Sequence, residues 1–142
     1  MTDLAEALIG EEEGRERCVY LDSRNLSTIG IGCLVDKSIP GAGLCDEAID
    51  VQFAHDSARA RKDAAALPGF QRCNEVRQAV LVSMCFQLGS LRDWPRFRAA
   101  LALGDYNMAA QEGLDSTWAK QTPNRARRQM TMLASGQWEE KA

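Results

Sequence analysis

Apolar and polar residues follow one another along most of this chain with the period of an α-helix. Near the N-terminus, a cap at Thr2 or Asp3 predicts a first helix that ends with three glutamates, residues 11–13, before Gly14. The apolar residues on its buried face are Leu4, Leu8 and Ile9. The first helix is therefore expected to bring an acidic cluster to a reversal of the chain.

The period changes over residues 18–34, where β-branched and aromatic residues surround a turn sequence at residues 23–25. This pattern predicts a β-hairpin or a small sheet. A loop at residues 38–43 follows, and Asp46 is then expected to cap a long helix that runs to the break at Pro68. Further helices are expected near residues 76–88, 97–103 and 106–114, and from a cap at Thr122 to Gly136.

The composition fits one globular domain, because the chain has 142 residues of which 45% are hydrophobic. It contains neither a signal-peptide pattern nor a run of about 18 apolar residues, so we expect a soluble protein without stable membrane association. The net charge of −3 argues against a general nucleic-acid binder. The first 70 residues carry −6 and the remainder +3, so the C-terminal half is a candidate face for an acidic polymer, or an ordinary mixed-charge surface.

The five cysteines do not suggest a metal site or a disulfide framework. They form no CxxC pair, and the chain has a single histidine, His55. We expect reduced thiols, of which at least one is unpaired because the number is odd. No metal and no organic cofactor are expected.

Two acidic residues flank the predicted turn from helix to hairpin and are candidates for catalysis. Glu13 and Asp22 are close enough in sequence for both side chains to reach one cleft, and Thr28 follows on the next strand. Two carboxyl groups in different environments are the minimum that glycoside hydrolysis requires, one as acid and the other to orient water. The alternative is that both are ordinary solvated residues.

A set of sequence blocks in a fixed order carries a more specific signal. The blocks are EG at 13–14, YLD at 20–22, STIGIG at 27–32, MCFQLG at 84–89, WAKQTPNRARR at 118–128 and GQW at 136–138. Together they closely resemble the T-even phage lysozymes, glycoside hydrolase family 24. The resemblance extends along nearly the whole chain.

The resemblance implies roles for four residues. Glu13 matches the general acid, Asp22 the residue that positions the attacking water and Thr28 the residue that assists it, with inversion at the anomeric carbon as the outcome. Arg125 matches an arginine that pairs with the catalytic glutamate. Such a partner favours the ionised carboxylate, so substrate binding or desolvation is needed to restore the acid.

Other positions are assigned to the sugar-binding cleft only by the resemblance. Leu34 and Phe86 match residues that line the cleft, although both are also suited to simple packing. Further wall-contacting positions fall on Ala100 and Glu112, where the family has Ser and Asn. Trp94, Trp118 and Trp138 are candidates for sugar stacking, but we expect Trp118 and Trp138 to serve mainly in packing.

One departure from the family is Cys33, which stands where the family often has a histidine. The usual ion pair of that histidine with a helix aspartate, here Asp56, is therefore not expected. A nucleophilic role for Cys33 is disfavoured, because no histidine is expected beside it.

The fold expected from the resemblance is α+β, mainly α, with two lobes. An N-terminal lobe of about residues 1–45 holds the small β-hairpin or sheet, a linking helix spans about residues 46–67, and a helical lobe covers about residues 68–142. Closure of the lobes around the linking helix would then control access to an active site between them.

The expected function is that of an endolysin, a lysozyme that hydrolyses the β-1,4 bond between N-acetylmuramic acid and N-acetylglucosamine and lyses the host. Its partner is bacterial peptidoglycan. It would act as a monomer that waits in the host cytoplasm and reaches the periplasm and cell wall after holin-dependent release. The alternatives are a virion tail-associated lysozyme, a lytic transglycosylase and an inactive wall-binding protein.

Overall fold

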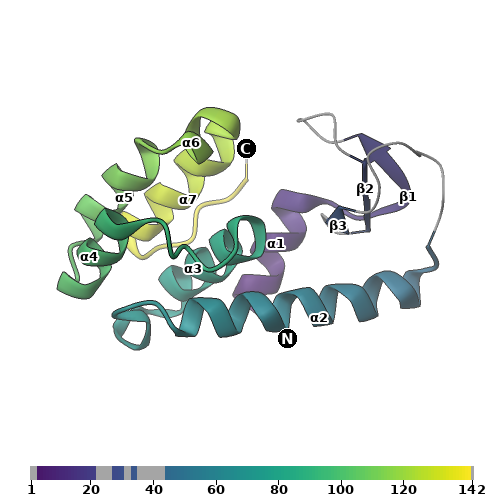
Figure 1. The fold of residues 1–142 in the computed structure, drawn as a ribbon, viewed down its shortest axis with the longest axis horizontal. Helices are drawn as coiled ribbons and strands as arrows, with labels where there is room; N and C mark the ends of the chain where they lie inside the picture. The colour runs from purple at the N-terminus through teal and green to yellow at the C-terminus, as the bar shows by residue number, and fades with distance from the viewer. Residues whose placement is uncertain (1–2, 22–26, 31–32, 35–43, 142) are drawn as a thin grey trace.

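A computed structural model describes residues 3–21, 27–30, 33–34 and 44–141, with side chains for 3–15 and 44–141 (Figure 1). Its elements are α1 (Leu4–Glu13), β1 (Glu16–Leu21), β2 (Ser27–Gly30), β3 (Cys33–Leu34), α2 (Asp46–Ala65), the 3-10 turn η1 (Phe70–Arg72), α3 (Glu75–Leu88), α4 (Pro95–Leu103), α5 (Tyr106–Leu114), α6 (Thr117–Gln121) and α7 (Pro123–Ser135). The mainly helical character expected from the sequence is confirmed. No helix in the described ranges is both long and apolar enough to cross a membrane.

The first helix has the ends that the sequence predicted. The carboxylate of Asp3 accepts a hydrogen bond from the backbone N–H of Ala5 at 2.8 Å, which caps α1 at its N-terminus. The helix ends at Glu13, and Gly14 follows with φ at 72°, a left-handed value that favours glycine. The acidic cluster of residues 11–13 therefore forms the last turn of α1.

Three short strands follow α1 and form an antiparallel sheet in the order β1-β2-β3. Leu21 pairs with Ser27 across β1 and β2, and the register is irregular between Glu16 and Tyr20. Thr28 lies in the central strand, opposite Tyr20 on one side and Leu34 on the other. The turn expected at residues 23–25 lies outside the described residues.

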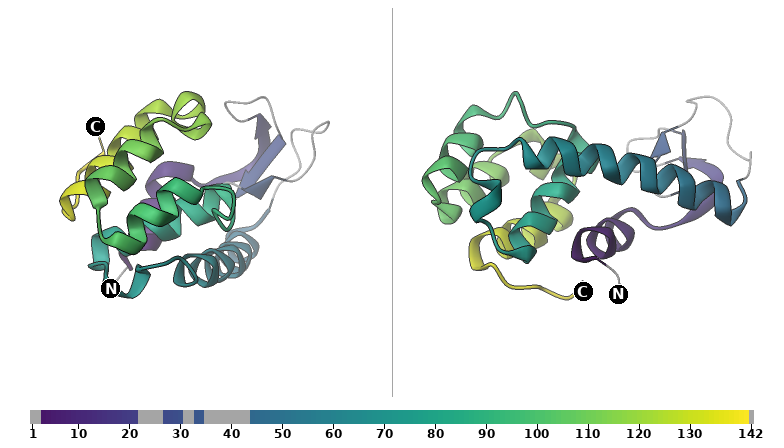
Figure 2. Two further views of the ribbon diagram at one scale, coloured as in Figure 1. Left: turned by 60° about the vertical axis from the view of Figure 1, so that its left-hand side comes forward. Right: turned by 90° about the horizontal axis from the view of Figure 1, so that it is seen from below.

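The long helix α2 runs from the sheet to the other helices along one side of the molecule (Figures 1 and 2). The expected cap at Asp46 is wrong, because Cys45 occupies the cap position without a side-chain hydrogen bond and Asp46 is already helical. Asp46 instead contacts the guanidinium of Arg15, with 3.3 Å between Oδ1 and Nη2. The division of the chain into two lobes around this helix stays a prediction.

Helix α3 is the centre of the helical body, with α1, α2 and α7 packed against it. The segment expected to be a buried central helix is confirmed, since every residue from Ala79 to Cys85 is buried. Beyond α7, helices α5 and α4 form a further part of the body. The core therefore surrounds α3, and both α1 and α7 are fixed relative to it.

The last two helices differ in detail from the expectation. Helix α6, a short helix capped by the Ser116 side chain, was not among the elements expected from the sequence. The N-cap position expected for Thr122 before Pro123 is confirmed, but its side chain does not cap the helix, because its hydroxyl donates to the carbonyl of Trp118 at 3.0 Å. The end of α7 at Gly136 is confirmed, with a left-handed φ of 71°.

The turn after α2 provides a test of the packing. Gly69 has a φ of 77°, and a Cβ there would lie 2.6 Å from the backbone oxygen of Leu101 in α4. We expect Gly69→Ala to lower the free energy of unfolding by about 3 kcal/mol, from a left-handed backbone and a steric clash. Gly104→Ala is the control, because its φ of 71° is similar and no atom lies within 4 Å. Equal losses in urea unfolding would show that the close approach to Leu101 has no effect.

Candidate active site

The predicted general acid, Glu13, is held by an arginine from the far end of the chain. Nη1 of Arg125, in the first turn of α7, donates to Oε1 of Glu13 at 2.6 Å. The two side chains are only 8% and 16% exposed. A charge-assisted hydrogen bond with so little access to water is strong and geometrically defined. The expected pairing of Arg125 with Glu13 is thus present across 112 residues of sequence.

The two neighbouring glutamates of α1 are held by a second arginine of the same helix. Arg128 donates to Glu12 at 2.9 Å and to Glu11 at 2.8 Å, and the Glu12 side chain is only 5% exposed. Burial alone lowers the pKa of Arg128, but the hydrogen bonds with Glu12 and Glu11 outweigh it and raise the pKa above its usual value. Arg128 is therefore a permanent positive charge beside Glu11 and Glu12.

Residues after α7 complete the surroundings of these carboxylates. The backbone carbonyl of Glu139 accepts two hydrogen bonds from Arg128, at 2.7 and 2.9 Å. The ring of Trp138 lies 5.4 Å from the same guanidinium, and Nζ of Lys141 donates to the carbonyl of Glu11. The half-buried position of Trp138 agrees with the packing role expected for it.

Two buried polar residues beside Arg125 were missed by the sequence analysis. Ser83 of α3 accepts hydrogen bonds from Nη2 of Arg125 at 3.2 Å and from Nε2 of Gln129 at 3.0 Å. Both Ser83 and Gln129 are fully buried. The available signal was a polar residue at a core position, between Val82 and Met84 in an otherwise apolar run.

The remaining candidate residues of the active site lie on or next to the sheet. Asp22 follows the end of β1 but is outside the described residues, so its distance from Glu13 stays untested. Thr28 and Leu34 occupy paired positions in β2 and β3. Because β1 begins three residues after Glu13, the sheet lies next to the acidic end of α1 (Figure 1).

Phe86, the cleft candidate from the helical part, lies near the end of α3 and is half-buried. Its ring packs edge-to-face on Phe53 of α2, with 5.9 Å between the ring centroids. The guanidinium of Arg59, also in α2, donates to the carbonyls of Phe86 at 3.2 Å and of Cys85 at 3.4 Å. The structure thus shows the packing role of Phe86, and its contact with sugar stays a prediction.

The cysteines whose side chains are described are all free thiols: Cys45, Cys73 and Cys85. Burial, followed by the nearby carboxylate of Asp63, raises the pKa of Cys85 to about 12. Cys85 is therefore a neutral packing residue at physiological pH. The side chain of Cys33 is not among those described, and Asp56 contacts Gln52 and His55 on its own helix.

Of the two additional wall-contacting positions, one does not fit. Ala100 is only 1% exposed and belongs to the core, so it cannot touch a polymer. Glu112 is half-buried and lines a cavity of about 470 Å³ between α4 and α6. Trp118 and Trp94 also line this cavity and pack edge-to-face at 6.2 Å. The packing role expected for Trp118 is confirmed, since it is 2% exposed.

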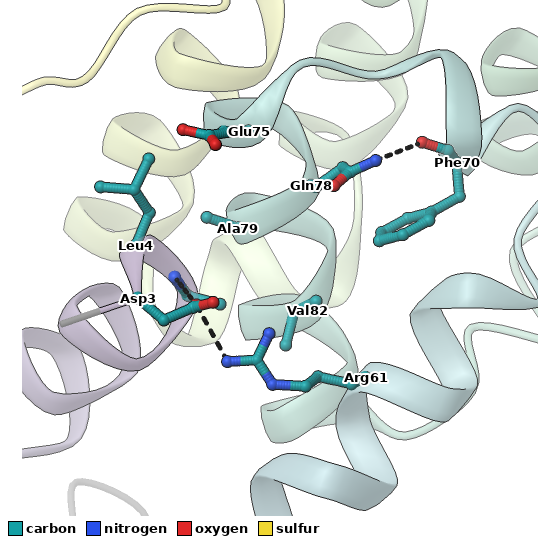
Figure 3. A pocket seen from close by; sticks show the side chains of 9 residues that line it. Asp3, Leu4, Arg61, Phe70, Glu75, Gln78, Ala79 and Val82 are labelled. Carbon is teal, nitrogen blue, oxygen red and sulfur yellow. Dashed lines mark hydrogen bonds and ion pairs between the residues drawn. The ribbon is translucent and has the colours of Figure 1, made fainter. Parts of the chain in front are cut away.

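A larger cavity of about 530 Å³ lies near the opposite end of α1, among α1, α2 and α3 (Figure 3). The ion pair of Arg61 with Asp3, at 2.9 Å, crosses one side of it. The ten residues of α1 are about 15 Å long, which separates this cavity from Glu13. Among the side chains that the structure describes, no group of His, Cys, Asp or Glu is arranged to hold a metal ion.

Comparison with known proteins assigns the chain to a family. The profile of the phage lysozymes matches residues 10–134, which include Glu13, Arg125 and Arg128. The chain belongs to the phage lysozyme family. The family supports a glycoside hydrolase that acts on peptidoglycan.

The chain is also similar to a curated protein, the pre-baseplate central spike protein Gp5 of Enterobacteria phage T4. The two sequences are 28% identical over 160 aligned positions, which cover 93% of this chain. The chain spans only 28% of the length of that relative. The match is therefore to one part of that larger relative.

The hydrogen bonds of Arg128 with Glu11 and Glu12 are expected to stabilise the folded protein. Arg128→Met leaves the buried carboxylate of Glu12 without its partner, so we expect the free energy of unfolding to fall by roughly 3 kcal/mol. Arg61→Met, which removes a more exposed ion pair with Asp3, should cost less than about 1 kcal/mol. Urea denaturation of both variants measures the difference. If Arg128→Met lowers the free energy of unfolding no more than Arg61→Met does, the hydrogen bonds of Arg128 with Glu11 and Glu12 are not important for stability.

Proposed function

We propose that this protein is a muramidase that hydrolyses the β-1,4 bond between N-acetylmuramic acid and N-acetylglucosamine, with Glu13 as general acid. Membership of the phage lysozyme family supports this reaction. The observation that carries the assignment of Glu13 is its asymmetric environment. Oε1 accepts from Arg125, whereas Oε2 has no hydrogen-bond partner in the described part of the chain. One oxygen is anchored, and the other is free to carry a proton to the substrate.

In the proposed reaction, Glu13 donates its proton to the glycosidic oxygen as the bond between that oxygen and the anomeric carbon breaks. A water molecule positioned by Asp22 and Thr28 attacks the anomeric carbon from the opposite face and gives a proton to Asp22. One water is consumed, and the configuration at the anomeric carbon is inverted. Inversion requires about 6.5–9.5 Å between the two carboxyl groups, which leaves room for the water.

Arg125 has a defined part in this proposal. A cation beside a carboxyl group stabilises its ionised form, and Glu13 is ionised after it has donated its proton. Arg125 therefore stabilises the carboxylate formed in the reaction, while exclusion of water by the substrate favours the protonated acid at the start. Leu34 and Phe86 are proposed to contact the sugars on either side of this site.

Substitution of the acid tests the proposal. We expect Glu13→Gln to release at least 100-fold less reducing sugar from purified peptidoglycan than the wild type, because general acid catalysis contributes about 10²–10⁴-fold. Glu47→Gln, at an exposed position of α2, is the matched control and should retain full activity. Circular dichroism confirms that both variants are folded. Equal activity of Glu13→Gln and the wild type would refute the assignment of Glu13.

The products of the same reaction separate hydrolysis from its closest rival. A lytic transglycosylase cuts the same bond but closes an anhydro ring on the muramic acid without consuming water. Mass spectrometry should find reducing ends that carry one added water; anhydro ends would replace hydrolysis with transglycosylation. If the wild type binds the wall but releases no sugar, the inactive wall-binding alternative is correct.

A second question is whether the protein acts as an endolysin or as part of the phage particle, and the similarity to a phage protein bears on it. One setting is an endolysin that waits in the host cytoplasm as a monomer and is released by a holin to lyse the cell. The similarity to a phage central spike protein favours the virion-associated alternative instead. Proteomics of purified phage particles distinguishes the two settings. The protein should be a stoichiometric component of particles if it is virion-associated, and absent from them if it is an endolysin.

A further inference from the structure

A small polar network lies in the core between α3 and α7, directly behind Arg125. Ser83 and Gln129 are both 0% exposed, and Ser83 accepts one hydrogen bond from each of Arg125 and Gln129. Apolar residues of the core surround this network, among them Val82, Met84, Ala126, Met130 and Leu133. Buried polar groups destabilise a core unless they are fully satisfied, so the network needs an explanation beyond packing.

The network is not fully satisfied. Nε of Arg125 and Oε1 of Gln129 are buried and have no hydrogen-bond partner in the part of the chain that the structure describes. An apolar residue at position 129 would remove the unpaired Oε1, whereas Nε belongs to Arg125 itself and would stay unpaired. This arrangement is therefore poor for stability, and residues that break local rules of packing are concentrated at functional sites.

The network does control the orientation of one group, the guanidinium of Arg125. Of its nitrogen atoms, Nη1 donates to Glu13 and Nη2 donates to Ser83, and these two hydrogen bonds fix the plane of the guanidinium. Without the bond to Ser83, the plane would be free to rotate about the remaining bond. Gln129 in turn donates to Ser83 and holds the serine hydroxyl in place.

We propose that Ser83 and Gln129 are positioning residues for the general acid. They fix Arg125 so that its Nη1 binds Oε1 of Glu13 and leaves Oε2 directed to the substrate. This inference rests on the proposed role of Glu13. Because it acts on geometry in the catalytic step, loss of the network should lower kcat and leave KM nearly unchanged.

The experiment compares two buried serines. Ser83→Ala should lower kcat on purified glycan fragments by about 10-fold or more, because small misplacements of catalytic groups are costly. Ser57→Ala is the matched control, since Ser57 is 3% exposed and its hydroxyl, in the part of the chain that is described, binds the Ala54 carbonyl of its own helix. Ser83→Thr, which retains the hydroxyl, should restore most of the activity. Gln129→Met keeps the volume of the side chain and should lower kcat in the same direction.

A double-mutant cycle tests whether Ser83 acts through Arg125. In an Arg125→Met background, Ser83→Ala should lower kcat no further, because the group that it positions is gone. If the full effect of Ser83→Ala persists in that background, or if Ser83→Ala resembles Ser57→Ala, the inference is overturned. An effect on KM alone would also overturn it.

Nitrogen-15 NMR of the Arg125 guanidinium separates this inference from the proposed function. The two Nη groups should give distinct signals in the wild type and merge in Ser83→Ala, since the guanidinium then rotates faster. Unchanged signals would overturn the positioning role even if activity falls. Distinct signals in a wild type that releases no sugar would instead show that the network holds Arg125 but that the proposed function is wrong.

Discussion

Three adjacent carboxylates at the C-terminal end of one helix repel one another and the negative end of the helix dipole. In this protein α1 ends with such a cluster, and the compensation comes from Arg125 and Arg128, one turn apart on α7. Because α1 and α7 both pack on α3, the arginines meet the glutamates only when the helical core is assembled. The position of Glu13 thus depends on the tertiary fold rather than on its own helix.

The two arginines differ in what they do for the carboxylates. Arg128 donates hydrogen bonds to Glu11, to Glu12 and to the carbonyl of Glu139 after α7, so it holds the end of α1 against the C-terminal segment. Among the described residues, Arg125 has a single carboxylate partner, Glu13, and only Oε1 of that carboxylate accepts a hydrogen bond. The same helix therefore holds all three glutamates but in two different ways, and this difference is the reason why we propose Glu13 as the reactive member of the cluster.

Local signals predicted the elements better than their caps or their contacts. Gly14 and Gly136 marked helix ends correctly, because the ability to adopt a positive φ without steric cost is intrinsic to glycine. The cap expected at Asp46 was wrong, since Cys45 occupies that position. Thr122 does occupy the cap position, but its hydroxyl binds the Trp118 carbonyl and no backbone N–H of α7. The pairing of Arg125 with Glu13 came from family resemblance alone. Ser83 and Gln129 are 46 residues apart, and no local pattern joins them.

Some of the positive charges counted in the sequence are paired and buried in the folded protein. The positive excess after residue 70 suggested a face for an acidic polymer. Yet Arg125 and Arg128 are used inside the molecule to neutralise α1, and neither is more than 8% exposed. Charges that are paired and shielded from water contribute little to a long-range field. These two arginines therefore add to the positive excess of the sequence but contribute little to any attraction of an acidic polymer at a distance.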